Sequence, residues 1–311
     1  MSKPRILAIR GGAIGDFILT LPAIRLLREN FAHCHLEILG YRHIAALATE
    51  GGAAPGMVYA DDVRNIEAGP LAGFFARNGN LSPEWSEYFA SFQQVVSWLF
   101  DPDAIFETNV KRAGVKNYLS AHTKINDEAH ASAQLARGLE KMALFLDEPA
   151  ARLVPGEASV AAAEAWLVEQ GLDRAALAET VALHPGSGSP RKNWPAERWR
   201  EVGERLRAQG RRLLLVGGEA DERALAALAG LTPLVARALP LPTLAALLGG
   251  CAAYYGHDTG ISHLAAATGV PSTLLFGPTD PAVWAPQGAQ VRVLAAPEGE
   301  LARIEVGAVV G

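Results

Sequence analysis

The sequence lacks several features that would each point to a particular class of protein. Its 311 residues include two cysteines, too few for a disulfide framework and without the spacing of a zinc site. No segment reaches the ~18–20 uninterrupted apolar residues of a membrane-spanning helix. The formal net charge of −5 provides no general basic field for nucleic acid or an anionic membrane. We therefore expect a cytoplasmic globular protein with local binding sites.

The length and the order of predicted elements indicate two domains, because a single hydrophobic core stops growing near ~250–300 residues. Residues 4–10 are predicted as a buried strand, followed by a glycine-rich loop, a helix at 17–31 and a second strand at 35–40. This alternation is typical of a parallel sheet. A segment rich in proline, 149–156, ends the first run, and we place the domain boundary after Pro155.

The same alternation restarts after the boundary. Strands are expected at 180–184, 212–216, 252–256 and 273–277, with helices at 158–169, 196–209, 220–229, 244–248 and 261–268. Between 51 and 124 the pattern predicts only a strand at 95–100, and a long helix is predicted at 129–146. The expected fold is α/β: two Rossmann-like doubly wound domains, 1–155 and 156–311, facing across a cleft.

The loop after the first predicted strand does not fit a dinucleotide site. Residues 11–15 lack the G-x-G-x-x-G spacing, and the carboxylate of Asp16 at the helix start would repel a pyrophosphate. Asp16 could be an N-cap, which stabilises a helix by ~1 kcal/mol. It could also be a functional carboxylate that the helix N-terminus keeps ionised at neutral pH. The two interpretations are compatible.

A second loop, 184–195, is rich in groups that bind anions. Gly188 lets backbone amides approach a ligand, Ser187 and Ser189 carry hydroxyl groups, and Lys192 adds a positive charge. The pattern differs from the P-loop signature. An ordinary turn is the alternative, but the density of donors favours a diphosphate site.

A third cluster opens the predicted helix at 261–268. Asp258, Thr259 and Gly260 follow a strand, so amides at the helix start would point toward a ligand at the strand end, with His263 one turn further on. The nearby histidines hint at a metal, but the spacing places no fourth ligand. A simple capping sequence is the alternative.

Two further loops border the same predicted site. Glu219 comes just after the strand at 212–216, the position of an acid that accepts hydrogen bonds from a ribose diol. Residues 277–281 (Gly-Pro-Thr-Asp-Pro) follow the last predicted strand and are expected to form a rigid turn.

Three segments taken in order, 10–23, 184–199 and 258–281, resemble glycosyltransferase family 9, the ADP-heptose:lipopolysaccharide heptosyltransferases. The resemblance implies a GT-B fold in which 1–155 binds the acceptor and 156–311 binds the nucleotide sugar. It implies an inverting, metal-independent glycosyltransferase. Such an enzyme would move a heptose or a related sugar, with ADP-heptose as the expected donor, to a lipopolysaccharide core or another cell-envelope acceptor.

The resemblance also assigns roles to matching residues. Asp16 matches the general base that deprotonates the acceptor hydroxyl, and Lys192 matches the cation that steadies the leaving phosphate. Glu219 matches the ribose-binding acid. The other expected donor-binding residues are Ser187, Gly188, Ser189, Asp258, Thr259, Gly260 and His263. No metal or cofactor is implied beyond the nucleotide sugar.

The expected partners are a nucleotide sugar and a lipid-linked saccharide at the inner membrane surface, and no nucleic acid is expected to bind. We therefore expect the enzyme in the cytoplasm, where it could be peripheral to the inner membrane. Two other functions stay open. One is a catalytically silent GT-B protein that binds a nucleotide sugar, although Asp16 and Lys192 favour an enzyme. The other is a GT-B nucleotide-sugar epimerase, which would need no acceptor.

Overall fold

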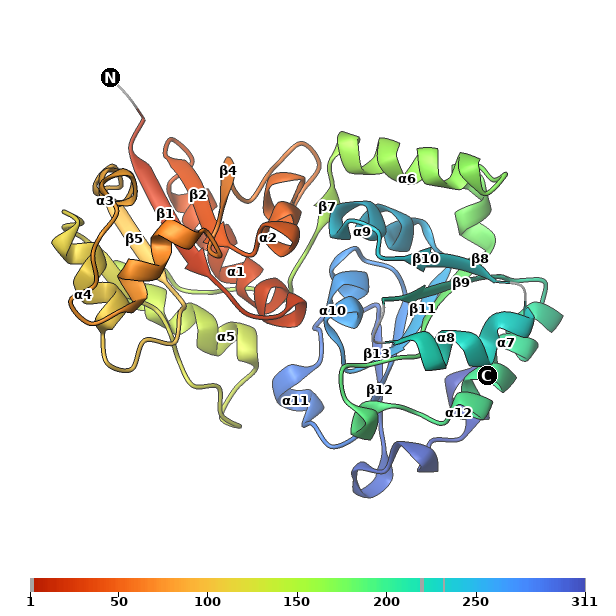
Figure 1. The fold of residues 1–311 in the computed structure, drawn as a ribbon. Coiled ribbons are helices and arrows are strands. Elements are labelled where there is room, and N and C mark those ends of the chain that lie inside the picture. Colours follow the sequence, from red (N-terminus) through yellow and green to blue (C-terminus); the bar gives the residue numbers. More distant parts are fainter. Residues whose placement is uncertain (1–2, 219–220, 232, 311) are drawn as a thin grey trace. The chain divides into compact units, whose positions relative to one another are not determined.

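The computed structural model describes residues 3–218, 221–231 and 233–310 (Figure 1). The chain forms two compact units: unit 1 comprises Met1–Ala53 and Met57–Pro149, and unit 2 comprises Ala54–Gly56 and Ala150–Gly311. The main division falls after Pro149, whereas the sequence analysis placed it after Pro155. Within the described ranges, none of the helices combines the length and apolar character of a transmembrane span.

Unit 1 is built on a five-stranded parallel sheet with the order β4-β2-β1-β5-β6 (Figure 1). The strands are β1 (Arg5–Arg10), β2 (His35–Gly40), β4 (Asp62–Asn65), β5 (Gln94–Ser97) and β6 (Tyr118–Ser120). The helices are α1 (Ile14–Asn30), α2 (Arg42–Thr49), α3 (Pro83–Ala90), α4 (Ile105–Arg112) and α5 (Ala131–Ala136), with 3-10 turns η1 (Gly69–Phe75) and η2 (Arg137–Met142).

The central strand of unit 1 is apolar because both of its faces are covered. Leu7 and Ile9 join a buried cluster with side chains of α3 and α4, among them Phe89 and Phe106. Successive side chains of a strand point to opposite faces, and Ala8 between them is also fully buried. Such a strand is a continuous apolar run, which explains why the sequence predicted it.

Unit 2 contains a six-stranded parallel sheet with the order β10-β9-β8-β11-β12-β13. The strands are β8 (Thr180–His184), β9 (Arg212–Gly217), β10 (Leu234–Arg237), β11 (Ala253–His257), β12 (Ser272–Phe276) and β13 (Val291–Ala295). The helices are α6 (Glu157–Glu169), α7 (Ala196–Ala208), α8 (Glu222–Leu228), α9 (Leu241–Gly250), α10 (Gly260–Ala267), α11 (Pro281–Trp284) and α12 (Val306–Val309). Short 3-10 turns are η3 (Arg174–Glu179), η4 (Pro190–Lys192), η6 (Ala229–Leu231), η7 (Pro297–Gly299) and η8 (Leu301–Arg303).

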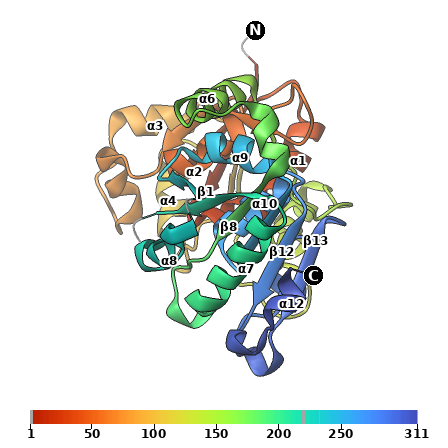
Figure 2. The same cartoon turned by 90° about the vertical axis from the view of Figure 1, so that its right-hand side faces the viewer.

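Helix α7 crosses one face of the unit 2 sheet (Figure 2). Its Trp199 and Val202 are fully buried against strand residues such as Leu183 and Leu215. Numbered within the unit, the strand order is 3-2-1-4-5-6, which is that of a Rossmann fold. The predicted α/β class with two parallel, doubly wound sheets is confirmed.

Both sheets reverse their strand order next to their first strand, between β1 and β5 in unit 1 and between β8 and β11 in unit 2. Ligands of open α/β sheets bind at this reversal, outside the carboxyl ends of the strands. The strands there end at Arg10 and Ser97 in unit 1, and at His184 and His257 in unit 2. A ligand-binding site is therefore expected in the loops that follow these four residues.

The predicted long helix at 129–146 is wrong. The chain forms the short helix α5 and then the 3-10 turn η2, and Ala143, which follows this turn, is in a left-handed conformation with φ of 57°. Gly138 lies in this turn, and a Cβ there would come within 2.6 Å of Ala121. Glycine disfavours a regular helix by about 1 kcal/mol relative to alanine, and here it also permits close backbone packing.

Candidate functional site

The loops after β8 and β11 are linked directly by histidines at the two strand ends. Nδ1 of His184 lies 3.2 Å from the hydroxyl of Thr259, and Nδ1 of His257 lies 3.4 Å from the carbonyl oxygen of Gly186. Each contact joins the end of one strand to the loop that follows the other. The two segments predicted to bind the donor therefore lie together at the strand-order reversal of unit 2.

Three loops of unit 2 meet at one carboxylate oxygen. Nζ of Lys192, at the end of η4, donates to Oδ2 of Asp258 at 2.5 Å, and the hydroxyl of Thr279 donates to the same oxygen at 2.6 Å. The side chain of Asp258 is 10% exposed and that of Lys192 is 30% exposed. Charge-assisted hydrogen bonds of this kind are short and strong, and Asp258 neutralises the Lys192 charge.

His257 fixes the loop that carries Lys192. Its ring is fully buried, and Nε2 accepts hydrogen bonds from the backbone amide of Trp194 at 2.9 Å and from the indole N–H of Trp199 at 3.3 Å. Nδ1 therefore carries the proton and donates to Gly186. Burial lowers the pKa of His257 to about 3, so the ring is neutral at ordinary pH. His257 is a structural anchor.

In the part of the chain that the structure describes, no three or more His, Cys, Asp or Glu side chains are grouped to hold a metal ion. Both cysteines, Cys34 and Cys251, are buried, and burial raises the pKa of both thiols, that of Cys251 to about 12.

The serines of the second loop shape the loop itself. The hydroxyl oxygen of Ser187 lies 2.7 Å from the Ser189 carbonyl oxygen and 2.7 Å from Oδ1 of Asn193, and it accepts from the Ser189 amide at 3.3 Å. Ser187 is buried, whereas Gly188 is exposed, and a Cβ built at Gly188 meets nothing within 4 Å. The open part of this loop is thus its backbone at Gly188.

Thr259 caps helix α10, which begins at Gly260. The Thr259 hydroxyl accepts from the amide of Ser262 at 3.3 Å, and the Ser262 hydroxyl in turn donates to the carbonyl of His257. His263 lies in the first turn of this helix and is 6% exposed. Thr259 is therefore the N-cap of α10, and the ligand-binding interpretation of this cluster stays a prediction.

Glu219, the predicted ribose-binding acid, lies outside the described residues. Sequence reasoning missed a neighbouring acid, Asp221, which accepts from the amide of Gly218 at 2.9 Å and lies 3.6 Å from Nε2 of His184. The contact with His184 and the Gly218 amide lower the pKa of the Asp221 carboxyl, although burial opposes this. A Cβ at Gly186 would lie within 1.9 Å of Asp221, so only glycine fits there.

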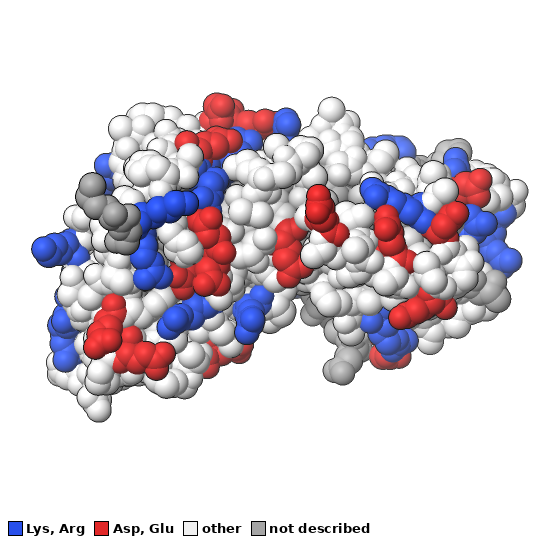
Figure 3. All heavy atoms as spheres, turned by 90° about the horizontal axis from the view of Figure 1, so that it is seen from above, with Lys and Arg blue, Asp and Glu red and all other residues white. Residues whose placement is uncertain are grey.

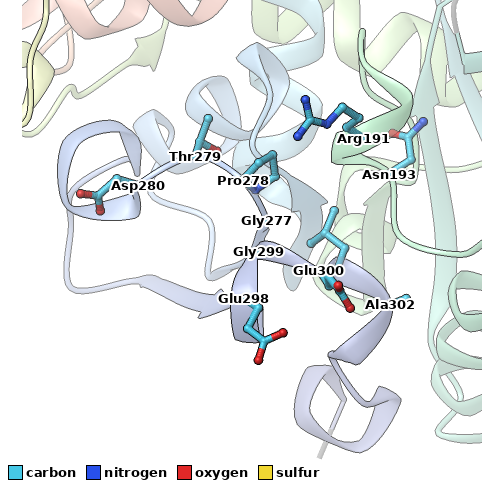
Figure 4. A pocket seen from close by; sticks show the side chains of 11 residues that line it. Arg191, Asn193, Gly277, Pro278, Thr279, Asp280, Glu298, Gly299, Glu300 and Ala302 are labelled. Atoms are coloured by element: carbon cyan, nitrogen blue, oxygen red, sulfur yellow. The ribbon is translucent and has the colours of Figure 1, made fainter.

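A pocket of about 850 Å³ lies next to the Lys192–Asp258 pair within unit 2 (Figure 4). Thr279, the second donor to Asp258, forms part of its wall. Its lining also includes Arg191, Asn193, Gly277, Pro278, Asp280, Glu298, Gly299, Glu300, Leu301 and Ala302. The predicted turn at 277–281 therefore borders this pocket, and Asp280 caps α11 by accepting from the amide of Ala282 at 2.8 Å.

In unit 1, Asp16 is not an N-cap. Helix α1 begins at Ile14, so Ala13 is the cap residue and Asp16 is the third helical residue, whose Oδ2 accepts from the Ala13 amide at 3.1 Å. Its other oxygen, Oδ1, lies 3.6 Å from the guanidinium of Arg10. The Asp16 side chain is 44% exposed, while that of Arg10 is 11% exposed. The carboxylate therefore supports the helix start and still reaches solvent.

A second pocket, of about 390 Å³, lies at the strand-order reversal of unit 1. It is lined by Arg10, Gly11, Gly12, Tyr41, Ile66, Glu67, Phe75, Trp98, Leu99, Phe100 and His122. The ring of Phe100, which is 75% exposed, lies 5.4 Å from the ring of His122. Sequence reasoning missed this pocket because most of its aromatic residues come from 51–124, where the pattern predicted a single strand.

Solved structures show that the fold is GT-B. The glycosyl transferase family 9 from Veillonella parvula aligns with a TM-score of 0.79 at 20% identity, covering 99% of this chain and 95% of that one. The E. coli heptosyltransferase WaaC with ADP aligns with a TM-score of 0.71 at 20% identity, covering 98% and 97%.

The chain belongs to glycosyltransferase family 9 (heptosyltransferase), whose sequence profile matches residues 109–308. Lipopolysaccharide heptosyltransferase 1 from Pseudomonas aeruginosa is 42% identical over an alignment of 123 residues, which covers 36% of this chain and 34% of that protein. The aligned part thus spans about a third of this curated relative. The resemblance to family 9 is confirmed. The profile covers Lys192, Asp258 and Thr279, whereas Asp16 lies before it.

Proposed function

We propose that the protein is an inverting, metal-independent glycosyltransferase that moves a heptose from ADP-heptose to a lipopolysaccharide core or a similar cell-envelope acceptor. The observation that carries this proposal is the meeting of Lys192, Asp258 and Thr279 at the strand-order reversal of unit 2. It supports a site for an anionic leaving group, and family membership supports the reaction class.

Unit 2 is proposed as the donor domain. Lys192 and the backbone near Gly188 would contact the diphosphate, while Asp258, Thr259 and Gly260 would hold the sugar and phosphate at the start of α10. Ser187, Ser189 and His263 would support these groups from within the loop and the helix, because Ser187 and His263 are buried. Glu219 keeps its proposed role at the ribose.

Unit 1 is proposed as the acceptor domain. The pocket beside Arg10 is lined by the rings of Tyr41, Trp98 and Phe100, which offer flat apolar surfaces, and by few polar groups. Asp16 lies shortly after β1, the strand that ends at Arg10, and its carboxylate is partly exposed. A saccharide hydroxyl presented by a lipid-linked acceptor at the cytoplasmic surface of the inner membrane would reach this carboxylate.

The proposed reaction forms one glycosidic bond and breaks another. The acceptor oxygen attacks the anomeric carbon while Asp16 accepts its proton, and the bond from that carbon to the diphosphate oxygen breaks with the electron pair leaving on ADP. Lys192 neutralises the negative charge that develops on the leaving oxygen, where a preorganised cation lowers the barrier. The attack from the side opposite the leaving group inverts the anomeric configuration.

A thermal-shift panel tests the proposed donor class. ADP, UDP, GDP and CDP would each be added to the protein, since a ligand present at ~100 times its Kd adds ~2.7 kcal/mol to the free energy of unfolding. We expect ADP to raise the unfolding temperature most. A larger shift with UDP, GDP or CDP would contradict ADP-heptose as the donor, and no shift with any of them would contradict a nucleotide-sugar site.

A further inference from the structure

The positive charge of Lys192 is already compensated before a substrate binds. Its ammonium lies 2.5 Å from Oδ2 of Asp258, and the carboxylate is 10% exposed, so the pair is close to neutral as a unit. A nucleoside diphosphate carries more than one negative charge at neutral pH. A site that relies on this pair alone would leave most of the ligand charge uncompensated, which is unfavourable in a partly enclosed pocket.

The residue before Lys192 carries a positive charge that could compensate the remaining negative charge of a diphosphate. Arg191 is exposed and lines the 850 Å³ pocket together with Asn193 and Thr279. Within the described ranges, its guanidinium has no carboxylate within 4.0 Å, unlike that of most arginines in unit 2. In Figure 4 the Arg191 side chain extends over the pocket toward the side of Thr279.

The acidic residues of the same pocket are held by other partners. Arg303 lies 2.9 Å from a carboxylate oxygen of Glu298 and 2.7 Å from one of Glu300. Asp280 caps α11, and Figure 4 shows its carboxylate at the far side of the turn from Arg191. These carboxylates therefore do not pair with Arg191, and its charge stays available at the pocket wall.

We propose that Arg191 is a second phosphate-binding residue of the donor site, which takes up the ligand charge that the Lys192–Asp258 pair leaves uncompensated. This inference rests on the proposed function of unit 2. Because η4 is a 3-10 turn, consecutive side chains project about a third of a turn apart, so Lys192 contacts Asp258 while Arg191 faces the pocket. The planar guanidinium can donate two parallel hydrogen bonds to a phosphate group in a fixed geometry, whereas an ammonium acts as a point charge.

Calorimetric titration with inorganic pyrophosphate and with ADP tests the inference. The variants are Arg191→Ala, Arg191→Lys and the control Arg292→Ala, which removes an exposed arginine of β13 outside the pocket. We expect Arg191→Ala to weaken both ligands about tenfold at low salt and to reduce the dependence of affinity on salt. Arg191→Lys should lose less, and the control should match the wild type. Arg191 is exposed, so the unfolding midpoint should be unchanged.

The outcomes separate this inference from the proposed function. Equal pyrophosphate affinities of the wild type and Arg191→Ala would overturn the inference even if ADP binds well. Failure of the wild type to bind pyrophosphate would also overturn it. Pyrophosphate binding that depends on Arg191, in a protein that binds no nucleoside diphosphate more tightly, would support the anion site and contradict the nucleotide-sugar donor.

Discussion

The ammonium of Lys192 lies 2.5 Å from Oδ2 of Asp258, a carboxylate that is 10% exposed. The two residues come from loops after different strands of one sheet, so the fold brings a cation and an anion together at the strand-order reversal. On the face that Figure 3 shows, basic and acidic side chains lie interspersed among uncharged ones. The Lys192–Asp258 pair gives the first prediction.

Lys192→Ala should weaken ADP binding and lower turnover together. The variant lacks the positive charge that would face the diphosphate, both in the bound state and in the transition state. It also leaves the Asp258 carboxylate with Thr279 but without a cation, which should cost about 1–3 kcal/mol of unfolding free energy. The double variant Lys192→Ala/Asp258→Asn should recover part of the stability and none of the turnover. Urea unfolding measures the stabilities and calorimetry measures ADP binding. If the losses of unfolding free energy in Lys192→Ala and Asp258→Asn simply add up in the double variant, the two side chains do not stabilise each other and the prediction is wrong.

Asp16→Asn distinguishes a base from a structural residue. Asparagine can still accept a hydrogen bond from the Ala13 amide, so we expect stability and ADP affinity close to those of the wild type. If Asp16 is the base, kcat should fall by ~10²–10⁴. Asp103→Asn, which changes an exposed carboxylate of unit 1, is the control. An Asp16→Asn enzyme with wild-type kcat would leave Asp16 as a support of the helix start.

ADP should bind equally well in EDTA and in magnesium, because hydroxyl, amide and ammonium donors supply the contacts in the proposed site. Calorimetric titration in EDTA, followed by titration in excess magnesium, measures both affinities. Loss of binding in EDTA that magnesium restores would show that the metal-independent proposal is wrong.

His257 should make stability depend on pH. Its pKa is lowered from 6.5 to about 3 in the fold, so below pH 6.5 the unfolded chain binds a proton that the folded chain does not. The free energy of unfolding should therefore fall as the pH drops from 6.5 toward 3, by up to about 1.4 kcal/mol per pH unit from this group. His257→Gln, which keeps an acceptor for the Trp194 amide, should reduce that slope. An unchanged slope in urea unfolding would contradict the neutral, buried ring.

The sequence predicted central strands better than edge strands for a physical reason. β1 and β8 are covered on both faces and are continuous apolar runs. β4 has one exposed and three half-buried residues, and β10 ends in an exposed arginine, so neither shows a clear pattern. The predicted helix at 129–146 failed because the apolar spacing of its residues does not reveal the backbone contact between Gly138 and Ala121.

The structure brings the two predicted donor-site loops together, but several contacts between their residues could not be found from the sequence. Glycine-rich segments after strands mark the carboxyl end of a parallel sheet, so the loops at 184–195 and 258–263 could be found from sequence. The bond from Thr279 to Asp258 and the contact of Asp221 with His184 join residues far apart in the chain. Only the folded arrangement of the strands reveals such pairs.

The most direct test of the proposed function is transfer itself. The protein would be incubated with ADP-heptose and a lipid-linked lipopolysaccharide-core acceptor, while released ADP and the mass of the acceptor are measured together. We predict one heptosyl unit added to the acceptor for each ADP released, and no conversion of the donor when the acceptor is left out. ADP release without a gain in acceptor mass, or a donor that is isomerised in the absence of acceptor, would contradict the assignment as a heptosyltransferase.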